Sequence, residues 1–294
     1  MLLPRIRVHL LLPFCLLATI TFLIPLTARD SLSQEVPPQT EEQRQARDLL
    51  NKGVTDFKNG RVEDAISDFA RSKQLDPQLL NARLYLATAY ASLYIPGAPS
   101  EENQQKGQAA IAEFRGVLTL QPQNLSAVDG IGSILFQMAG TSGFDADMMQ
   151  ESKSFHQKHT EINPQDPEPY YWIGVIDWTL AFRASGLYRA RYNLNVHGKQ
   201  LSDEDPLPAE VRYEYAKEYE PTIEEGIESL QKALQLRADY DDAMAYLNLL
   251  YRRKADIVET KAQREELGKM ADDLLDKVKE IKQKRLEAAP QPPN

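Results

Sequence analysis

One helical phrase occurs twice in the chain, as AISDFARSKQLDP at 65–77 and as AIAEFRGVLTLQP at 110–122. Both copies carry Ala, Ile, Phe, Leu and Pro at the same offsets. The apolar residues recur at steps of one, three or four, which is the period of a helix that buries one face. Proline cannot continue a helix, so each phrase predicts a helix followed by a stop.

Two weaker copies follow, SKSFHQKHTEINP at 152–164 and GIESLQKALQLRA at 226–238. Each phrase has a second amphipathic segment next to it, and a small residue stands in the middle of that segment. These small residues are Gly53, Ala87, Gly132 and Gly174. A side chain this small allows a partner helix to approach closely. Self-similarity of this kind indicates a repeat array.

The pattern resembles the tetratricopeptide repeat family, whose unit is a helix–turn–helix of about 34 residues. The unit at 46–79 fits closely, with Gly53, Phe69 and Pro77 at the small, aromatic and proline positions of the family pattern. Ser72 replaces an alanine that the family pattern expects. The resemblance implies an all-α fold, a right-handed superhelical solenoid of about five helical hairpins.

The match extends over 46–253, but the phrases are spaced more widely than one unit. The surplus falls between the first and second helix of a unit, as inserts at about 92–108, 140–147 and 183–221. Insertions at corresponding places in a stacked array emerge along one edge, often the binding side. The layout also resembles that of a group of exported bacterial tetratricopeptide proteins.

The first 33 residues have the layout of an export signal. Arg5 and Arg7 precede an uncharged run from Leu10 to Ala28, and polar residues follow. The segment is either a cleaved signal peptide or a retained anchor, because a run of this length can span a bilayer. Both alternatives place the chain from Gln34 onward outside the cytoplasm, in the periplasm or on the outer face of the inner membrane.

The rest of the chain divides into a linker at 34–43, the array with its inserts at 44–288, and a disordered tail at 289–294. The segment REELGKMADDLLDKVKEIKQKRLEAA at 264–289 keeps its apolar residues on one helical face. We expect this long helix to be the cap that solenoids need.

Charge and cysteine content argue against several functions. The chain has a formal net charge of −9 and no dense cluster of Lys and Arg. Binding to nucleic acid, or broad adsorption to an anionic membrane, is therefore not expected. The only cysteine is Cys15, so the chain beyond it has no thiol for a disulfide, a metal or a nucleophile.

No catalytic or cofactor motif appears, whether HExxH, a P-loop, GxGxxG after a strand, or GxSxG. His156 and His159 stand three apart on one predicted helix and could share a metal. No clear third ligand is near, and both lie at repeat positions that normally turn into the stack. We therefore predict no metal, no cofactor and no catalytic residue. Asn124 is interpreted as a helix N-cap.

The segment YYWIGVIDWTLAF at 170–182 holds both tryptophans of the chain. Trp172, Ile173 and Ile176 follow the face that packs between repeats. The resemblance places Tyr171, Val175 and Trp178 on the face that lines the concave groove of the family. These three residues are either core or an aromatic surface that contacts a ligand.

The same repeat positions in the other first helices complete a predicted groove, which is mostly apolar. Its further members are Val54, Phe57, Leu84, Phe136 and Leu249. Family members that bind an acidic peptide C-terminus carry Lys, Asn and Arg at such positions, whereas only Arg252 is basic here. The groove instead suits an amphipathic helix or an extended apolar segment of a protein partner.

The sequence thus predicts a non-enzymatic scaffold for protein–protein interaction or assembly at the bacterial cell envelope. The alternative is a ligand-binding protein or enzyme with a small-molecule or glycan site between the 183–221 insert and the 170–182 segment. The insert holds five tyrosines beside Arg183, Arg189 and Arg191. A further interpretation makes this insert a helical lid folded over the groove.

Overall fold

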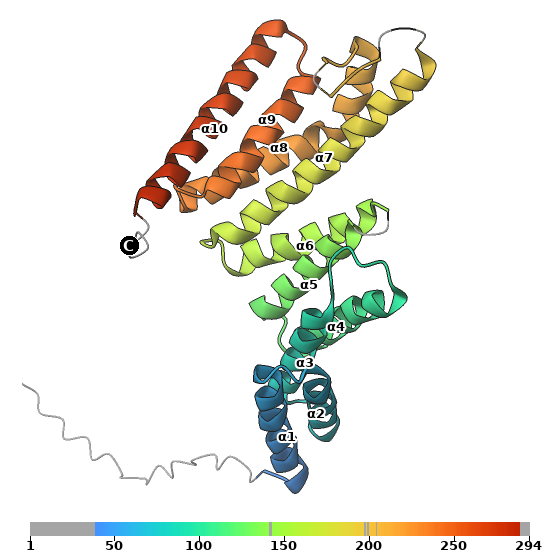
Figure 1. Ribbon diagram of the computed structural model, residues 1–294, viewed down its shortest axis with the longest axis vertical. Coiled ribbons are helices and arrows are strands. Elements are labelled where there is room, and N and C mark those ends of the chain that lie inside the picture. Colours follow the sequence, from blue (N-terminus) through green and yellow to red (C-terminus); the bar gives the residue numbers. More distant parts are fainter. Residues whose placement is uncertain (1–38, 141–142, 197, 199, 204, 289–294) are drawn as a thin grey trace, which may run out of the picture. The chain divides into compact units, whose positions relative to one another are not determined.

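The computed structural model describes residues 39–288 except 141–142, 197, 199 and 204 (Figure 1). The chain divides into the units Met1–Gln39 and Thr40–Asn294. The predicted export signal, the first half of the predicted linker and the predicted tail lie outside the described residues. Among those described, no helix has the length and apolar character needed to cross a membrane.

The described residues form ten helices and no strand. They are α1 (Glu41–Lys58), α2 (Val62–Leu75), α3 (Leu80–Leu93), α4 (Glu101–Leu120), α5 (Leu125–Ala139), α6 (Ala146–Ile162), α7 (Pro167–Asn195), α8 (Ala209–Leu236), α9 (Asp241–Ile257) and α10 (Lys261–Ala288).

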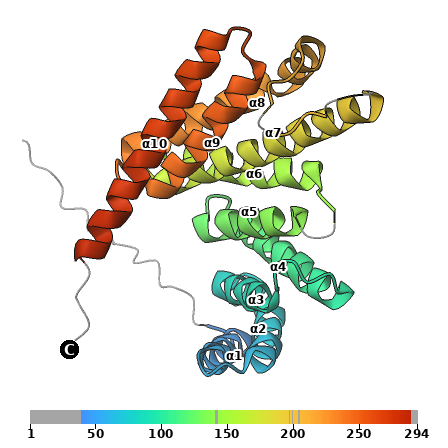
Figure 2. The ribbon, with the colours of Figure 1, turned by 45° about the horizontal axis from the view of Figure 1, so that its top comes forward.

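The helices pair in chain order into five hairpins, and each hairpin packs against the next (Figures 1 and 2). The first hairpin is α1 with α2, and the fifth is α9 with α10. In the fourth, α7 contacts both its partner α8 and the following α9. This arrangement confirms the predicted all-α solenoid of about five hairpins.

Small residues let the two helices of a hairpin cross closely. A Cβ atom added at Gly53 would lie 2.6 Å from Cε1 of Phe69, and one added at Gly174 would lie 2.3 Å from Cγ of Leu230. Neither site has room for a methyl group, because carbon atoms repel strongly at such distances. The repeated small residue therefore sets the spacing within the hairpin.

The helix ends follow local chemistry. Proline stops the second helices as predicted, since α2, α4 and α6 end two residues before Pro77, Pro122 and Pro164. Asn124 caps α5 by accepting a hydrogen bond from the backbone N–H of Ala127 at 3.0 Å.

The boundary of the predicted linker at 34–43 needs a correction, because α1 already begins at Glu41. Thr40 and Gln43 form a capping box, in which each side chain accepts a hydrogen bond from the other residue's backbone N–H. This reciprocal pair stabilises the first turn of the helix. The last three residues of the predicted linker therefore belong to the array.

The first two inserts contain loops. A turn follows Leu93 before α4 begins, and a loop joins α5 to α6. The insert at 183–221 differs, because most of it continues α7 to Asn195 and begins α8 at Ala209. Pro221, the last residue of the predicted insert, lies inside α8.

The insert therefore lengthens the fourth hairpin, and the prediction of a separate helical lid over the groove is wrong. Tyr215 gives the physical reason. Its side chain is fully buried, and its hydroxyl donates to the backbone carbonyl of Ala181 at 2.9 Å. The apolar contact and the hydrogen bond hold the start of α8 against α7.

The last helix caps the array as expected from its apolar face. It packs against α9 and buries Leu267, Ala271 and Val278. Met270 on the same face is 39% exposed.

Candidate functional site

Seven of the eight predicted groove residues are partly buried. They are Val54, Phe57, Leu84, Phe136, Tyr171, Trp178 and Leu249. Val175 differs, because it is 2% exposed and belongs to the core of this structure. Val175 is therefore a core residue, whereas the other seven keep part of their surface exposed to solvent.

These side chains pack on different parts of the array. Val54 and Phe57 lie against the core of the first hairpin, and Leu84 lies against the core shared by α3, α4 and α5. Phe136 packs beside residues of α6 and α7. The structure therefore distributes the predicted groove over several hairpins, and it joins only part of it into one continuous aromatic surface.

That surface is a row of five rings, here called the aromatic ladder. In spatial order its members are Tyr240, Tyr171, Tyr246, Trp178 and Phe182. Successive ring centroids are 5.1, 5.8, 5.3 and 5.2 Å apart. These separations are typical of favourable aromatic pairs. The first four rings alternate between α9, with Tyr240 as its N-cap, and α7, and the fifth ring, Phe182, again belongs to α7. The ladder therefore links the fourth hairpin to the fifth.

The ladder runs from the core to the surface. Tyr240 is 6% exposed at one end, and Phe182 is 40% exposed at the other. Burial raises the pKa of the Tyr171 and Tyr246 hydroxyls, so both stay neutral at pH 7. The rings between the ends are partly open, which makes the ladder a candidate contact surface for an apolar ligand.

Sequence reasoning found Tyr171 and Trp178 but missed the other three members. Phe182 lies one helical turn beyond Trp178, and this spacing could have found it. Tyr240 and Tyr246 come from the next hairpin, and only the packing of α7 against α9 brings them to Tyr171.

The opposite face of α7 packs between hairpins as predicted. Ile173 and Ile176 are buried. The ring of Trp172 lies 5.3 Å from that of Phe136 and stacks 5.9 Å from the imidazole of His156. Trp172 therefore joins the third hairpin to the fourth, while Trp178 belongs to the ladder.

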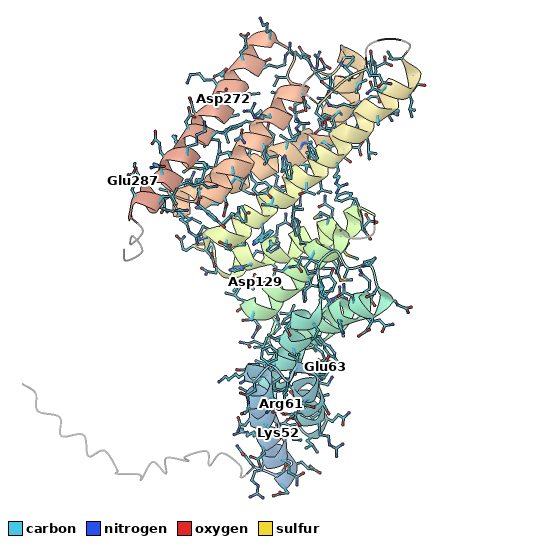
Figure 3. The ribbon with its side chains drawn as sticks, viewed as in Figure 1. Lys52, Arg61, Glu63, Asp129, Asp272 and Glu287 are labelled. Carbon is cyan, nitrogen blue, oxygen red and sulfur yellow. The ribbon has the colours of Figure 1, made fainter. Side chains whose placement is uncertain are left out.

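His156 and His159 are both buried in the third hairpin, 2% and 4% exposed. Burial lowers the pKa of His156 to about 4, so its ring is neutral at pH 7. His159 Nδ1 lies 2.6 Å from the carboxylate of Asp129, which is labelled on α5 in Figure 3. No group of three potential metal ligands converges within the described ranges.

A buried ion network joins three helices. Lys153 of α6 contacts Asp177 of α7 at 2.8 Å and Glu225 of α8 at 2.9 Å. Asp177 is fully buried. Burial raises the pKa of its carboxyl to about 7, although the Lys153 charge opposes this rise. Sequence reasoning missed this network, because its members are far apart in the chain and each resembles an ordinary helix surface residue.

A second network holds the tip of the fourth hairpin. Arg189 is 3% exposed and donates to the backbone carbonyls of Ser202 and Asp205 at 3.1 and 2.7 Å. It also pairs with Asp256 of α9 at 3.0 Å, and Arg253 approaches the same carboxylate at 2.9 Å. Arg189 thus ties the segment between α7 and α8 to the fifth hairpin.

A cavity of about 490 Å³ lies at the exposed end of the ladder, and we call it the end cavity. Its lining residues are Phe144, Phe182, Arg183, Gly186, Leu187, Asp203 and Arg253. None of the eight predicted groove residues lines it. Phe144 belongs to the predicted insert at 140–147, and four other lining residues belong to the insert at 183–221, so these two inserts meet here.

No protein-family pattern and no curated protein sequence matches this chain. Solved structures do. The crystal structure of MamA aligns with a TM-score of 0.55 at 14% identity, over 85% of this chain and 99% of that chain. MamA 41-end from Desulfovibrio magneticus RS-1 aligns with a TM-score of 0.53 at 16% identity, over 84% and 98%.

A third structure is that of YrrB, described as a TPR protein with an unusual peptide-binding site. It aligns with a TM-score of 0.50 at 13% identity, over 83% of this chain and 95% of that chain. The chain has the tetratricopeptide-repeat fold. At these identities the likeness concerns the fold, because folds of this kind host many functions.

Proposed function

We propose that this tetratricopeptide-repeat chain is an exported scaffold that binds an apolar or amphipathic segment of a protein partner at the bacterial cell envelope. The aromatic ladder carries this proposal. It is a continuous row of five rings on the fourth and fifth hairpins, and all but Tyr240 are at least partly exposed. Aromatic side chains contribute strongly to binding at protein interfaces.

Two further observations support a protein or peptide partner. Repeat solenoids offer extended surfaces to partners, and YrrB, with the same fold, is described as having a peptide-binding site. The chain also carries a formal net charge of −9, which disfavours a nucleic acid as the partner.

The export part of the proposal rests on the N-terminal pattern of Arg5, Arg7 and the run from Leu10 to Ala28. A C-terminal alkaline phosphatase fusion, which is active only outside the cytoplasm, tests it. We expect an active fusion, and an inactive fusion at full expression would contradict export. The mass of the purified chain then distinguishes a cleaved signal from a retained anchor.

The groove part is tested with the two tryptophans as a matched pair. A partner is captured from envelope extracts with the full-length chain and purified. Trp178→Ala should weaken its binding by roughly 30-fold, about 2 kcal/mol, because the ring belongs to the open part of the ladder. Trp172→Ala removes a ring packed between hairpins, so it should lower the melting temperature with little change in the affinity of the folded protein.

A loss of stability without a loss of affinity in Trp178→Ala would contradict binding along the groove. If Trp178 is structural core only, its loss should cost about 3–5 kcal/mol of folding and leave affinity unchanged. A small-molecule or glycan site in the insert receives less support, because several of its polar groups are engaged within the chain. Arg191 pairs with Glu214 at 2.6 Å, and the Tyr188 hydroxyl donates to Glu218 at 2.7 Å.

A further inference from the structure

The end cavity has an apolar floor and an open rim. Phe182 and Leu187 line it and are 40% and 72% exposed. Phe144, from the loop before α6, closes the other side. A volume of about 490 Å³ falls within the roughly 300–1,000 Å³ of ligand pockets. The cavity is therefore large enough for a partner's side chain and its flanking backbone.

Gly186 contributes free space to the same cavity. A Cβ atom added there would meet no atom within 4 Å, unlike one added at Gly174 on the same helix, which would collide with Leu230. Gly186 thus does not serve close helix packing. A larger side chain at this position would extend into the cavity without disturbing the fold.

The charges at the rim favour an anion. Arg183 and Arg253 line the cavity with one carboxylate, Asp203, which leaves an excess of one positive charge. Arg253 is already paired with Asp256. Arg183 is exposed, and its guanidinium carbon lies 5.2 Å from the centroid of the Phe144 ring. Within the described part of the chain it has no carboxylate partner, so its charge is open to a ligand.

The place of the cavity indicates what kind of molecule fills it. It continues the aromatic ladder, because Phe182 is both the last rung and part of the cavity floor. An extended chain that lies along the ladder would reach the cavity with one of its side chains. A compact small molecule would use the cavity without the ladder, so the continuity favours a peptide.

We propose that the end cavity takes a large apolar side chain of a partner peptide, and that Arg183 binds a carboxylate of an adjacent residue of the same peptide. This inference rests on the proposed scaffold function and adds the partner's chemistry. The recognised unit is an aromatic or large aliphatic residue beside Asp or Glu. The aromatic ladder then contacts the apolar residues that extend away from it.

The experiment uses a library of short random peptides displayed on phage, selected on the full-length chain. Enriched peptides are synthesised, and their affinities are measured by fluorescence anisotropy. We expect a shared pair of a large apolar and an acidic residue. Gly186→Leu fills the cavity and should weaken binding by about tenfold or more, because the buried anchor is excluded. Gly268→Leu is the matched control, since Gly268 of α10 also faces open space.

Arg183→Gln tests the charge separately. It should weaken binding about threefold at low salt, and the difference from the unmodified chain should shrink at high salt, because exposed charges are screened. A peptide with Gln in place of its acidic residue should bind the unmodified chain and Arg183→Gln equally well.

The outcomes separate this inference from the proposed function. In one outcome, the peptides bind Gly186→Leu as tightly as the unmodified chain, yet lose affinity for Trp178→Ala. This result would contradict binding in the end cavity and would support binding along the groove. Enriched peptides without acidic residues would overturn the role of Arg183. If no peptide is enriched at all, the peptide-binding scaffold itself is contradicted.

Discussion

The first and fourth hairpins apply the same packing rule with different chemistry around it. In both, a glycine of the first helix receives an apolar side chain of the second, Gly53 with Phe69 and Gly174 with Leu230. In the first hairpin the cation of the ion pairs lies at the surface, although the two aspartates that it contacts are buried. Lys52, labelled with Arg61 in Figure 3, has a side chain that is 62% exposed while it bridges two aspartates. In the fourth hairpin, the corresponding ionic contacts of Asp177 are buried.

The difference separates the contacts that both hairpins share from the features that only the fourth hairpin adds. The glycine contact forms a hairpin wherever the repeat pattern occurs. The fourth hairpin adds the buried Asp177 and three rings of the aromatic ladder to that minimum, and the extension of α7 and α8 adds the buried Arg189 and most of the end cavity. A buried ion pair adds little net stability, since the desolvation cost offsets the attraction. We therefore interpret the additional features of the fourth hairpin mainly as contacts that hold its surface residues in place.

The largest expected effect comes from the buried lysine. Lys153→Met removes the cation that faces Asp177 and should destabilise the protein by about 3 kcal/mol, at the low end of the range for breaking buried pairs. The low end applies because the Asp177 carboxyl can take up a proton. Since its pKa is raised, the cost should be greater at pH 8 than at pH 5.

Lys52→Met is the matched control in the first hairpin. Its charge is exposed, so we expect little change in denaturant unfolding at either pH. The comparison between buried and exposed ions would fail if the two methionine variants lost equal stability. Adding Asp177→Asn to Lys153→Met should recover part of the loss, because the fully buried carboxyl is then absent and Glu225, which also loses the lysine, is 40% exposed.

The next effect tests what the two hairpins share. Gly174→Ala and Gly53→Ala each place a methyl group against a side chain that cannot move away freely. We expect a loss of about 1–3 kcal/mol for each, as for other overpacked cores. Urea unfolding of both variants measures it. A neutral result at either glycine would show that this hairpin tolerates a wider helix spacing.

A smaller effect concerns pH. His156 has a pKa of about 4 in the folded chain against an ordinary value near 6.5. Between pH 4 and pH 6.5 the unfolded state binds more protons than the folded state. The contribution of His156 to the free energy of unfolding is therefore complete above pH 6.5 and decreases as the pH falls toward 4. At pH 5.5 the loss should be about 1 kcal/mol.

The measurement is denaturant unfolding at pH 7 and pH 5.5 for the unmodified chain and for His156→Gln. The variant lacks the titrating ring, so its stability should change less between the two pH values. An equal change in both proteins would assign the acid sensitivity to groups other than His156. Helices α1 and α2 contain no histidine, so the hydrogen-exchange protection of these two helices should not show the pH dependence that His156 causes.

The smallest effect has the opposite sign. Gly186→Ala lies on the same helix as Gly174 but meets open space. It should stabilise the protein by about 0.5–1 kcal/mol, because alanine favours helix and loses less backbone entropy on folding. A loss of stability would mean that the surface near the end cavity is more crowded than the structure shows.

The hairpins could be read from the sequence because their signals are local. The helical period, the small residue and the closing proline lie within one unit, and they determined the helix pairs and most helix ends. The 183–221 insert was misjudged for the same reason. Its Pro221 indicated a boundary, yet the buried contact of Tyr215 with Ala181 outweighs the hydrogen bond that proline removes from α8.

The candidate site was only partly predictable. The repeat positions gave Tyr171 and Trp178, which belong to the ladder, and also Val175, which lies in the core. A repeat position specifies a direction on a helix. It does not specify how far the neighbouring hairpin covers that face, and this decides exposure.

The sequence by itself determined an all-α array of about five hairpins, because each hairpin forms from residues within one unit and each phrase repeats the same instructions. Only the tertiary structure decided which side chains meet between units. Tyr246 reaches Trp178 across two hairpins, and Lys153 reaches Glu225 across three helices. Such contacts depend on the angle between neighbouring helices and on the helix lengths, which the inserts change. The repeat pattern within one unit does not predict them.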